Sequence, residues 1–310
     1  MKILVLGAGA IGGYYGARLI EAGADVTFLV RPARQHRLQT RGLQIESGVG
    51  RFDHAVNTVI KASDAGQSDL VLLTCKAYDL DGAIEAIAPA VDAGAAVLPF
   101  LNGLGAYDRL DARFGRDKVL GGVAYIATTL TDEGVVQHLA DADTMIVGPR
   151  ARAAESVARR FFDLASTTPG SRKYAPDIDQ ALWDKWVLLA AGAAVCCLLR
   201  GTLREILQTN AGEKIMRSAI GECAAVAAAS GHALAPDTLA FTEGYLIAVQ
   251  SNWAASMMRD INQSRPRLEA DAIVGDMLAR AVSLGLAAPV LEAAYANLQI
   301  YQNRKAEETR

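Results

Sequence analysis

Hydrophobic residues follow different patterns in the two halves of the chain. In the first half, short β-rich runs such as KILVL, DVTFLV, DLVLLTCK and AAVLPFLNG alternate with helical stretches such as IGGYYGARLIEAG and DLDGAIEAIAPAV. This alternation predicts parallel βαβ units and therefore a doubly wound α/β sheet. Residues 121–149 depart from it, because they hold several short extended runs without helices, and they predict antiparallel strands. Residues 151–166 return to a helical pattern.

The second half of the chain is predicted to be almost entirely helical. Beyond TTPGSRKYAPDIDQ, which holds two prolines and several polar residues, apolar residues recur at helical spacing. The helices are expected over 181–208, 211–231, 236–250, 268–284 and 289–304. A chain of 310 residues exceeds what one core usually organises. We therefore predict an α/β domain over residues 1–172 and an all-α domain over residues 173–310.

The amino-acid composition and net charge limit the kinds of molecule that the protein is expected to bind. The chain is 51% hydrophobic and 21% charged with a formal net charge of −3, which gives no support for binding nucleic acid or an anionic membrane. No uninterrupted apolar run reaches the roughly 18 residues of a membrane span, and the glycine-rich start lacks a cleavage context for a signal peptide. No metal-ligand or CxxC spacing is found among the cysteines, which are Cys75, Cys196, Cys197 and Cys223. This usage fits a reducing compartment, so a cytoplasmic protein without a metal site is expected.

The turn after the first strand carries a dinucleotide-binding pattern. Gly7, Gly9 and Gly12 have the spacing GxGxxG, between a predicted strand and a predicted helix. Gly7 would make the tight turn, Gly9 would let a pyrophosphate approach the backbone, and Gly12 would let helix and strand pack closely. The free N–H groups of the helix would then face the anion. A glycine-rich turn without a ligand is the alternative. The residues expected to contact the cofactor here are Gly7, Ala8, Gly9, Ala10, Ile11 and Gly12.

The end of the second strand predicts which dinucleotide binds. NAD sites usually carry an acidic residue there, which binds the ribose hydroxyls. This strand has Asp25 at its beginning and Arg31 at its end, with Arg34 and Arg37 close by. A guanidinium can bind a 2′-phosphate and stack on adenine. NADPH is therefore expected rather than NADH, unless Arg31 is only a solvated loop charge.

A lysine opens the most apolar helix of the second half. Lys185 lies between Trp183 and Trp186, directly before a run from 186 to 199 that has no charged side chain. Lysine is rarely buried unless it is paired or functional. The competing interpretation is that the ammonium extends to solvent at the helix end.

Four segments together resemble the ketopantoate reductase (2-dehydropantoate 2-reductase) family over almost the full length. They are MKILVLGAGAIGGYYGARLIEAGADVTFLVR, LLTCKAYDL followed by LNGLG, GGVAYIATTL with GVVQH, and SMMRDINQSRPRLEADAIVG. The resemblance implies a Rossmann-type domain and a helical domain like the C-terminal one of 6-phosphogluconate dehydrogenases. It also implies NADPH-dependent reduction of a 2-oxo acid to a 2-hydroxy acid. The best-named reaction is 2-dehydropantoate to (R)-pantoate, in pantothenate biosynthesis.

The resemblance also implies roles for individual residues. Lys185 matches the general acid that protonates the carbonyl oxygen and contacts the substrate, and Glu269 matches the carboxylate that orders the site and contacts the cofactor. Asn102 matches an asparagine beside the nicotinamide that also contacts the substrate. Lys76 matches a lysine that contacts the cofactor or helps at the site, and Ser256 matches a serine that binds the substrate carboxylate.

Elementary chemistry supports a proton donor and leaves alternatives for the other residues. A ketone that accepts a hydride needs a proton on its oxygen. Burial would lower the pKa of Lys185, and Glu269 would limit that fall. Without the resemblance, Lys76 could be a solvated residue at a strand end, Asn102 a turn residue, Ser256 a helix-end hydroxyl, and Glu269 an acid that complements a helix dipole.

The helix after Lys185 departs from the family's pattern. The family carries asparagines four and eight residues after the lysine, on its face of the helix. Here these positions are Leu189 and Ala193. The change favours a more apolar 2-oxo acid, or another carbonyl compound, as an alternative substrate. A second alternative is an NADP(H)-binding sensor without turnover. No partner beyond the small substrate is implied, although the alanine- and leucine-rich helices could bury a homodimer surface.

Overall fold

The chain divides into two compact units. The structure, a computed structural model, describes residues 1–308, apart from the side chain of Asp141. The first unit comprises 1–101 and 106–182, and the second comprises 102–105 and 183–310. The predicted boundary at 172/173 lies before the observed division at 182/183. The helix that crosses the observed division begins at Ile178, within the first unit.

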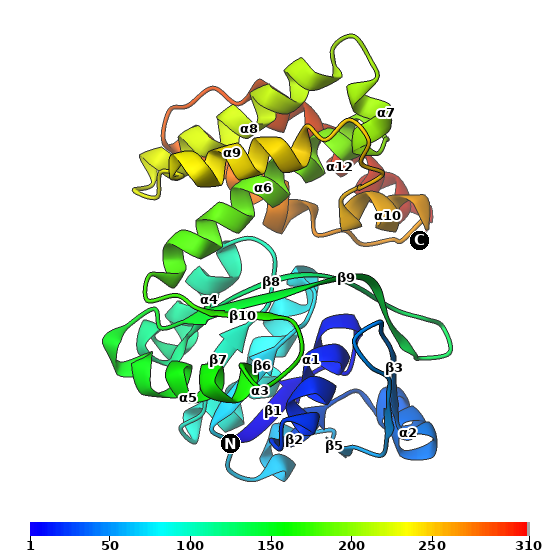
Figure 1. Cartoon of the computed structure of the whole chain (residues 1–310), viewed down its shortest axis with the longest axis vertical. Helices are drawn as coiled ribbons and strands as arrows, with labels where there is room; N and C mark the ends of the chain where they lie inside the picture. The colour runs from blue at the N-terminus through cyan, green and yellow to red at the C-terminus, as the bar shows by residue number, and fades with distance from the viewer. Residues whose placement is uncertain (309–310) are drawn as a thin grey trace. The chain divides into compact units, whose positions relative to one another are not determined.

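Five parallel strands form the central sheet of the first unit (Figure 1). Their order is β5-β2-β1-β6-β7, and every pairing is parallel, so the order reverses direction next to β1, as in a Rossmann-type fold. The bounds are β1 Lys2–Leu6, β2 Asp25–Leu29, β5 Asn57–Val59, β6 Leu70–Leu73 and β7 Ala96–Pro99. The predicted doubly wound α/β architecture is confirmed.

A second sheet packs beside the first in the same unit. Its order is β10-β9-β3-β4, and β8 pairs with β9 in the antiparallel manner predicted for residues 121–149. The bounds are β3 Leu43–Glu46, β4 Phe52–His54, β8 Gly121–Leu130, β9 Val136–Gly148 and β10 Ser171–Tyr174. Strand β10 lies inside the proline-containing segment 167–180, beyond which the helical half was predicted.

Helix α1 is the central packing element of this unit, because it contacts strands of both sheets. Gly16 allows this approach, since a Cβ there would lie 2.5 Å from the ring of Phe28. The helices of the unit are α1 Ala10–Glu21, α2 Pro32–Arg41, α3 Leu80–Asp92, α4 Gly105–Phe114 and α5 Glu155–Ala165. The short 3₁₀ turns are Ala62–Ala65, Ala77–Asp79, Arg116–Lys118 and Arg152–Ala154.

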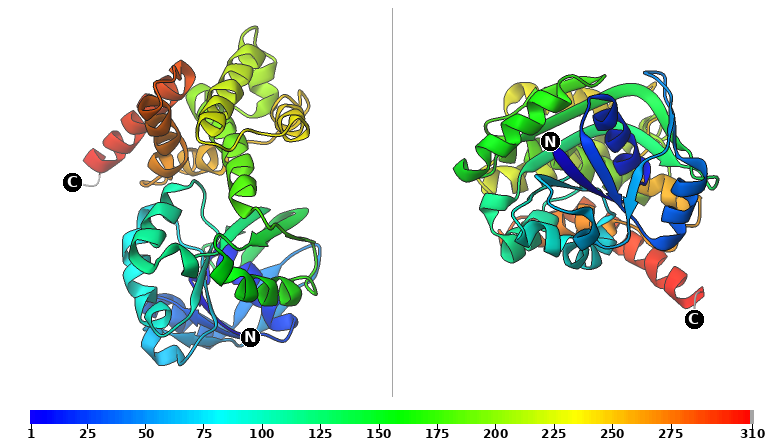
Figure 2. Two further views of the ribbon diagram at one scale, coloured as in Figure 1. Left: turned by 90° about the vertical axis from the view of Figure 1, so that its left-hand side faces the viewer. Right: turned by 90° about the horizontal axis from the view of Figure 1, so that it is seen from below.

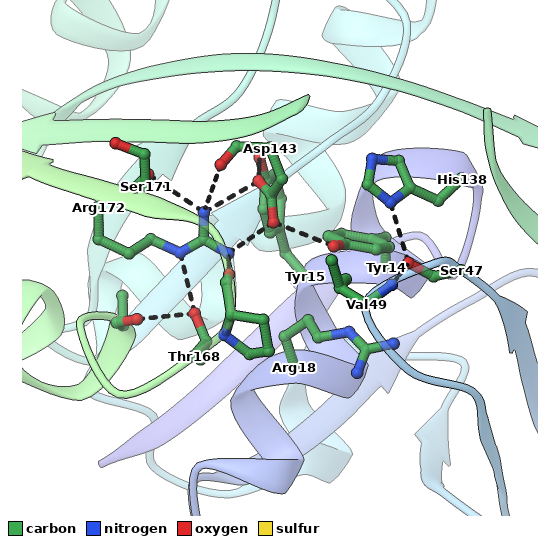
Figure 3. A network of polar contacts seen from close by, with 12 residues as sticks. Tyr14, Tyr15, Arg18, Ser47, Val49, His138, Asp143, Thr168, Ser171 and Arg172 are labelled. Carbon is green, nitrogen blue, oxygen red and sulfur yellow. Dashed lines mark hydrogen bonds and ion pairs between the residues drawn. The ribbon is translucent and has the colours of Figure 1, made fainter. Parts of the chain in front are cut away.

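A buried polar network joins α1 to the second sheet (Figure 3). The guanidinium of Arg172 on β10 donates to both carboxylate oxygens of Asp143 on β9, at 2.9 and 2.6 Å. The hydroxyls of Tyr14 and Tyr15 donate to the same carboxylate at 3.0 and 3.1 Å. Burial and the Asp143 charge raise the pKa of Tyr14 to about 12. Both tyrosines therefore remain donors, which a buried carboxylate requires.

The second unit is helical throughout its regular structure, and α8 packs against α7, α9, α11 and α12 (Figures 1 and 2). The bounds are α6 Ile178–Leu199, α7 Leu203–Leu207, α8 Gly212–Ala229, α9 Pro236–Leu246, α10 Ser256–Asn262, a π-helix over Asp271–Gly275, α11 Asp276–Ser283 and α12 Pro289–Glu308.

One predicted helix is wrong in extent, and another is present but differs in the type of its first turns. The helix expected over 181–208 breaks at Arg200, whose φ of 58° is left-handed, and α7 restarts with a capping box between Thr202 and Glu205. The helix expected over 268–284 begins with π-helical turns. Helices α2, α4 and α10 were not predicted.

Helix α6 is long and apolar enough to cross a membrane, with a mean hydropathy of 1.7 over its most apolar window. However, 78% of that window is buried inside the protein. Its side chains therefore pack in a core, as expected for the central helix of a folded domain.

Candidate active site

The glycine turn between β1 and α1 has the geometry that its spacing predicts. Gly7 has a φ of +91°, which only glycine adopts without strain. A Cβ at Gly12 would lie 2.1 Å from the carbonyl oxygen of Gly7, so helix and strand could not pack as they do. A Cβ at Gly9 would meet nothing within 4 Å. The backbone is therefore open at Gly9, where an anion would approach the first turn of α1.

The three arginines after β2 occupy different environments. Arg31 is the N-cap of α2, its side chain is 84% exposed, and its guanidinium lies 3.4 Å from the carboxylate of Asp79. Arg37 is exposed and donates to the carbonyl of Asp132 at 2.8 Å. Arg34 is partly buried and donates to the carbonyl of Ala8. Arg31 and Arg37 are thus both exposed, but Arg37 is held by the carbonyl of Asp132, so Arg31 remains the candidate ligand for a 2′-phosphate.

Lys76 and Asn102 follow neighbouring strands but belong to different units. Lys76 is exposed three residues beyond β6, in the first unit. Asn102 follows β7 and groups with the second unit. The cause is Gly103, since a Cβ there would lie 2.1 Å from the carbonyl oxygen of Ala272 and its φ is +84°. Glycine thus allows the chain after β7 to contact the π-helix that follows Glu269.

Lys185 lies in an apolar setting at the start of the buried part of α6. Its neighbours Trp183 and Trp186 are buried, and their rings lie 5.2 Å apart between centroids. Burial lowers the pKa of Lys185 to about 8, while the charge of Glu269 opposes this fall. The ammonium can therefore release a proton near neutral pH more readily than an ordinary lysine.

Glu269 is 5% exposed, although it lies far from Lys185 in the sequence. Its backbone carbonyl accepts a 3.1 Å hydrogen bond from the N–H of Ile273, which lies within the π-helix. The indole of Trp186 donates to the carbonyl of Ile273 at 3.0 Å. The guanidinium of Arg280, on α11, lies 5.4 Å from the Trp186 ring centroid. These contacts link the surroundings of Lys185 and Glu269, and π-helical turns often occur at functional sites.

The helix face that follows Lys185 is apolar. Leu189 is partly exposed one turn further on, and Ala193 is buried. At Gly192, a Cβ would lie 2.9 Å from the ring of Trp253 and 3.0 Å from Leu246. Trp253 therefore covers this turn of α6, a contact that the sequence pattern did not indicate. Ser256 is partly exposed and begins α10, three residues after Trp253.

The comparisons with known proteins agree with this organisation. The family model described as ketopantoate reductase PanE/ApbA matches residues 3–152, and the model for its C-terminal domain matches residues 177–302. The chain belongs to the ketopantoate reductase family. A Bacillus subtilis relative named uncharacterized oxidoreductase YkpB is 34% identical over 98% of this chain and 100% of its own.

Solved structures of similar fold extend over the whole chain. A Geobacter metallireducens protein titled 2-dehydropantoate 2-reductase is 29% identical, with a TM-score of 0.87 over 96% of this chain and 99% of its own. A structure titled D-mandelate dehydrogenase with NADH and anilino(oxo)acetate has a TM-score of 0.88 over 99% and 100%, but at 22% identity it shows the fold alone. The protein is thus an oxidoreductase of a family that includes 2-dehydropantoate 2-reductases.

The candidate site residues that the family resemblance implies are divided between the two units. Gly7 to Gly12, Arg31 and Lys76 lie in the first unit, and Asn102, Lys185, Ser256 and Glu269 lie in the second. Among the residues that the structure describes, no group of three metal-ligating side chains occurs. The arrangement offers a glycine turn with an open backbone in one unit and a lysine with a lowered pKa in the other.

Proposed function

We propose that this protein reduces a 2-oxo acid to a 2-hydroxy acid with NADPH. The observation that carries the proposal is Lys185, whose pKa is lowered to about 8 by burial, with Glu269 supplying the opposing charge. Within this family of oxidoreductases, a lysine in that state is suited to give a proton to a carbonyl oxygen. The reaction then takes place in the cytoplasm, as the cysteine usage suggests.

The dinucleotide fits the first unit. The open backbone at Gly9 and the close approach at Gly12 form the cradle that a pyrophosphate needs. The exposed guanidinium of Arg31 would bind a 2′-phosphate, and Lys76 would contact the cofactor. When bound, the reduced nicotinamide supplies the hydride that adds to the carbonyl carbon.

Residues of the second unit supply the proton and bind the 2-oxo acid substrate. As the carbonyl carbon is reduced, Lys185 Nζ donates its proton to the carbonyl oxygen and becomes a neutral amine, which solvent reprotonates. Glu269 orders the ammonium and contacts the cofactor. Asn102 contacts the substrate beside the nicotinamide, and Ser256 binds the substrate carboxylate.

The face of α6 that follows Lys185 bears on the choice between two candidate substrates. 2-Dehydropantoate is the best-named candidate, because it gives its name to relatives such as the Geobacter protein. A second candidate, a 2-oxo acid with an apolar acyl group, is favoured by Leu189, Ala193 and the cover of Trp253 over Gly192. Such a face has no amide to hydrogen-bond the hydroxyl of 2-dehydropantoate.

A substrate comparison tests the proposal. Initial rates of NADPH oxidation are measured with 2-dehydropantoate and with trimethylpyruvate, the same acid without its hydroxyl. A site that hydrogen-bonds the hydroxyl should prefer 2-dehydropantoate by roughly 10⁴-fold in kcat/KM, whereas an apolar site discriminates by about 10²-fold or less. Leu189→Asn should move the ratio toward 2-dehydropantoate. Reduction of neither acid, nor of any other 2-oxo acid in a panel, would contradict the proposal. Light scattering on the same sample tests whether the chain forms a homodimer.

A further inference from the structure

Arg34 links three segments that meet around the glycine turn. It lies on α2, and its Nε and Nη2 donate to the carbonyl of Ala8 at 3.1 and 2.8 Å. Its Nη1 donates to the carbonyl of Gly134 at 3.1 Å, in the hairpin between β8 and β9. One guanidinium thus connects α2, the glycine turn and the hairpin through backbone carbonyls.

These contacts distinguish Arg34 from Arg31, three residues earlier. Arg31 is mostly exposed, whereas Arg34 is partly buried with Nε and both terminal nitrogens engaged. Three of the five N–H donors of Arg34 are thus directed at the carbonyls of Ala8 and Gly134, which orients its guanidinium toward the turn and the hairpin. Burial and the charge of Arg37 lower its pKa, yet a guanidinium remains charged at neutral pH. It therefore holds a positive charge 2.8 Å from the turn's backbone.

The Ala8 carbonyl matters because it precedes the N-cap of α1. Once two guanidinium nitrogens hold this oxygen, the peptide that joins Ala8 to Gly9 is fixed in orientation. The N–H of Gly9 and those of the first turn of α1 are then preorganised for an anion, which lowers the ordering cost of binding. This effect concerns the pyrophosphate, which NADH and NADPH share.

We propose that Arg34 is a positioning residue for the pyrophosphate turn, supporting NADH and NADPH equally, and that the hairpin carbonyl of Gly134 holds Arg34 in place. The inference rests on the proposed dinucleotide function. It assigns the choice between the two dinucleotides to Arg31 alone.

Gly134 provides an independent way to disturb the same contact. Its φ is +87°, and a Cβ there would lie 2.6 Å from Arg34 Nη1 and 2.7 Å from Arg37 Cδ. Gly134→Ala should therefore displace Arg34 without changing any group of the turn itself. Residues in one hydrogen-bond network show non-additive effects, so the two sites should be coupled.

The experiment measures NADH and NADPH dissociation constants by calorimetry for the wild type, Arg34→Gln, Gly134→Ala and the double variant. Arg41→Gln, an exposed arginine on the same helix, is the matched control. Hydrogen exchange at the amides of residues 9–13 is followed in the same proteins without cofactor. Arg34→Gln should weaken both dinucleotides about tenfold, the scale of one charge-assisted hydrogen bond. It should also speed exchange in this turn.

The double variant should bind no more weakly than Arg34→Gln alone. A loss confined to NADPH would overturn the proposal, because it would make Arg34 a ligand of the 2′-phosphate. Unchanged exchange at residues 9–13 in Arg34→Gln would overturn it as well. Failure of the wild type to bind either dinucleotide would contradict the proposed function instead, and the exchange data, which need no cofactor, would still decide on Arg34.

Discussion

The indole nitrogen of Trp186 donates a 3.0 Å hydrogen bond to the carbonyl of Ile273, within the π-helix that follows Glu269. Trp186 is also the residue next to Lys185 in α6. The bond therefore joins the two segments that carry the proposed proton donor and its carboxylate. Both partners are buried, so an unmade bond would leave a polar group unsatisfied.

Trp186→Phe tests the value of this link. An aromatic side chain is kept, but it is smaller and the carbonyl of Ile273 loses this hydrogen bond, which should cost about 1–3 kcal/mol of unfolding free energy. Because Glu269 would then be held less firmly, kcat should fall more than NADPH affinity. Urea unfolding and steady-state kinetics measure the two effects. A stability loss with unchanged kcat would show that the bond has no part in positioning.

The lowered pKa of Lys185 predicts a pH dependence of the reduction. Only the protonated lysine can donate, and its pKa is about 8. The kcat/KM for reduction should therefore be level below that pH and fall about tenfold per pH unit above it. Oxidation of the 2-hydroxy acid should rise over the same range, because it needs the neutral amine. A reduction profile that stays level to about pH 10 would indicate a lysine of ordinary pKa.

Arg31→Asp tests the choice of cofactor. An aspartate at the end of β2 repels a 2′-phosphate but can accept hydrogen bonds from ribose hydroxyls. NADPH affinity should fall by two or more orders of magnitude, about 2.7 kcal/mol or more, while NADH affinity changes little. Fluorescence titrations with both dinucleotides measure this. Equal losses for both would refute the assignment of Arg31.

The Asp143–Arg172 pair predicts a large effect on stability. Their side chains are 0% and 3% exposed, so Arg172→Met leaves a buried carboxylate without its cation. Removing one partner of a buried pair typically costs about 3–5 kcal/mol. The matched control is Arg217→Met, which breaks an exposed pair with Glu213 and should cost about 0–1 kcal/mol. Similar losses from both variants in thermal unfolding would disprove a central role for the buried network.

The sequence predicted the elements that have a clear hydrophobic period and missed those that are marked only by helix start and stop signals. The strand–helix alternation, the antiparallel hairpin and the glycine turn follow from spacing and are present. Helix α2 was missed because its polar residues lack an apolar stripe, although Pro32 at its first position is a helix-start signal. The break after Leu199 also had a local signal, the Thr202–Glu205 capping box.

In the candidate site, local signals could be read from the sequence and long-range contacts could not. Lys185 could be singled out from its own neighbours, because an ammonium before a long apolar run is unusual. Its pairing with Glu269, the contact of Gly103 with Ala272 and the cover of Trp253 over Gly192 join residues far apart in the sequence. No periodicity encodes such contacts. The role of Glu269 came from the family resemblance alone, and it stays a prediction.

The most direct test of the account is the single-turnover rate of NADPH oxidation by Lys185→Ala with a reducible 2-oxo acid. General acid catalysis contributes about 10²–10⁴-fold, so the rate should fall by that factor while the NADPH dissociation constant is unchanged. Lys214→Ala, an exposed lysine on α8, is the control and should match the wild type. A fall of less than about tenfold in Lys185→Ala, or about 1.4 kcal/mol in the barrier, would contradict the assignment of Lys185 as the proton donor.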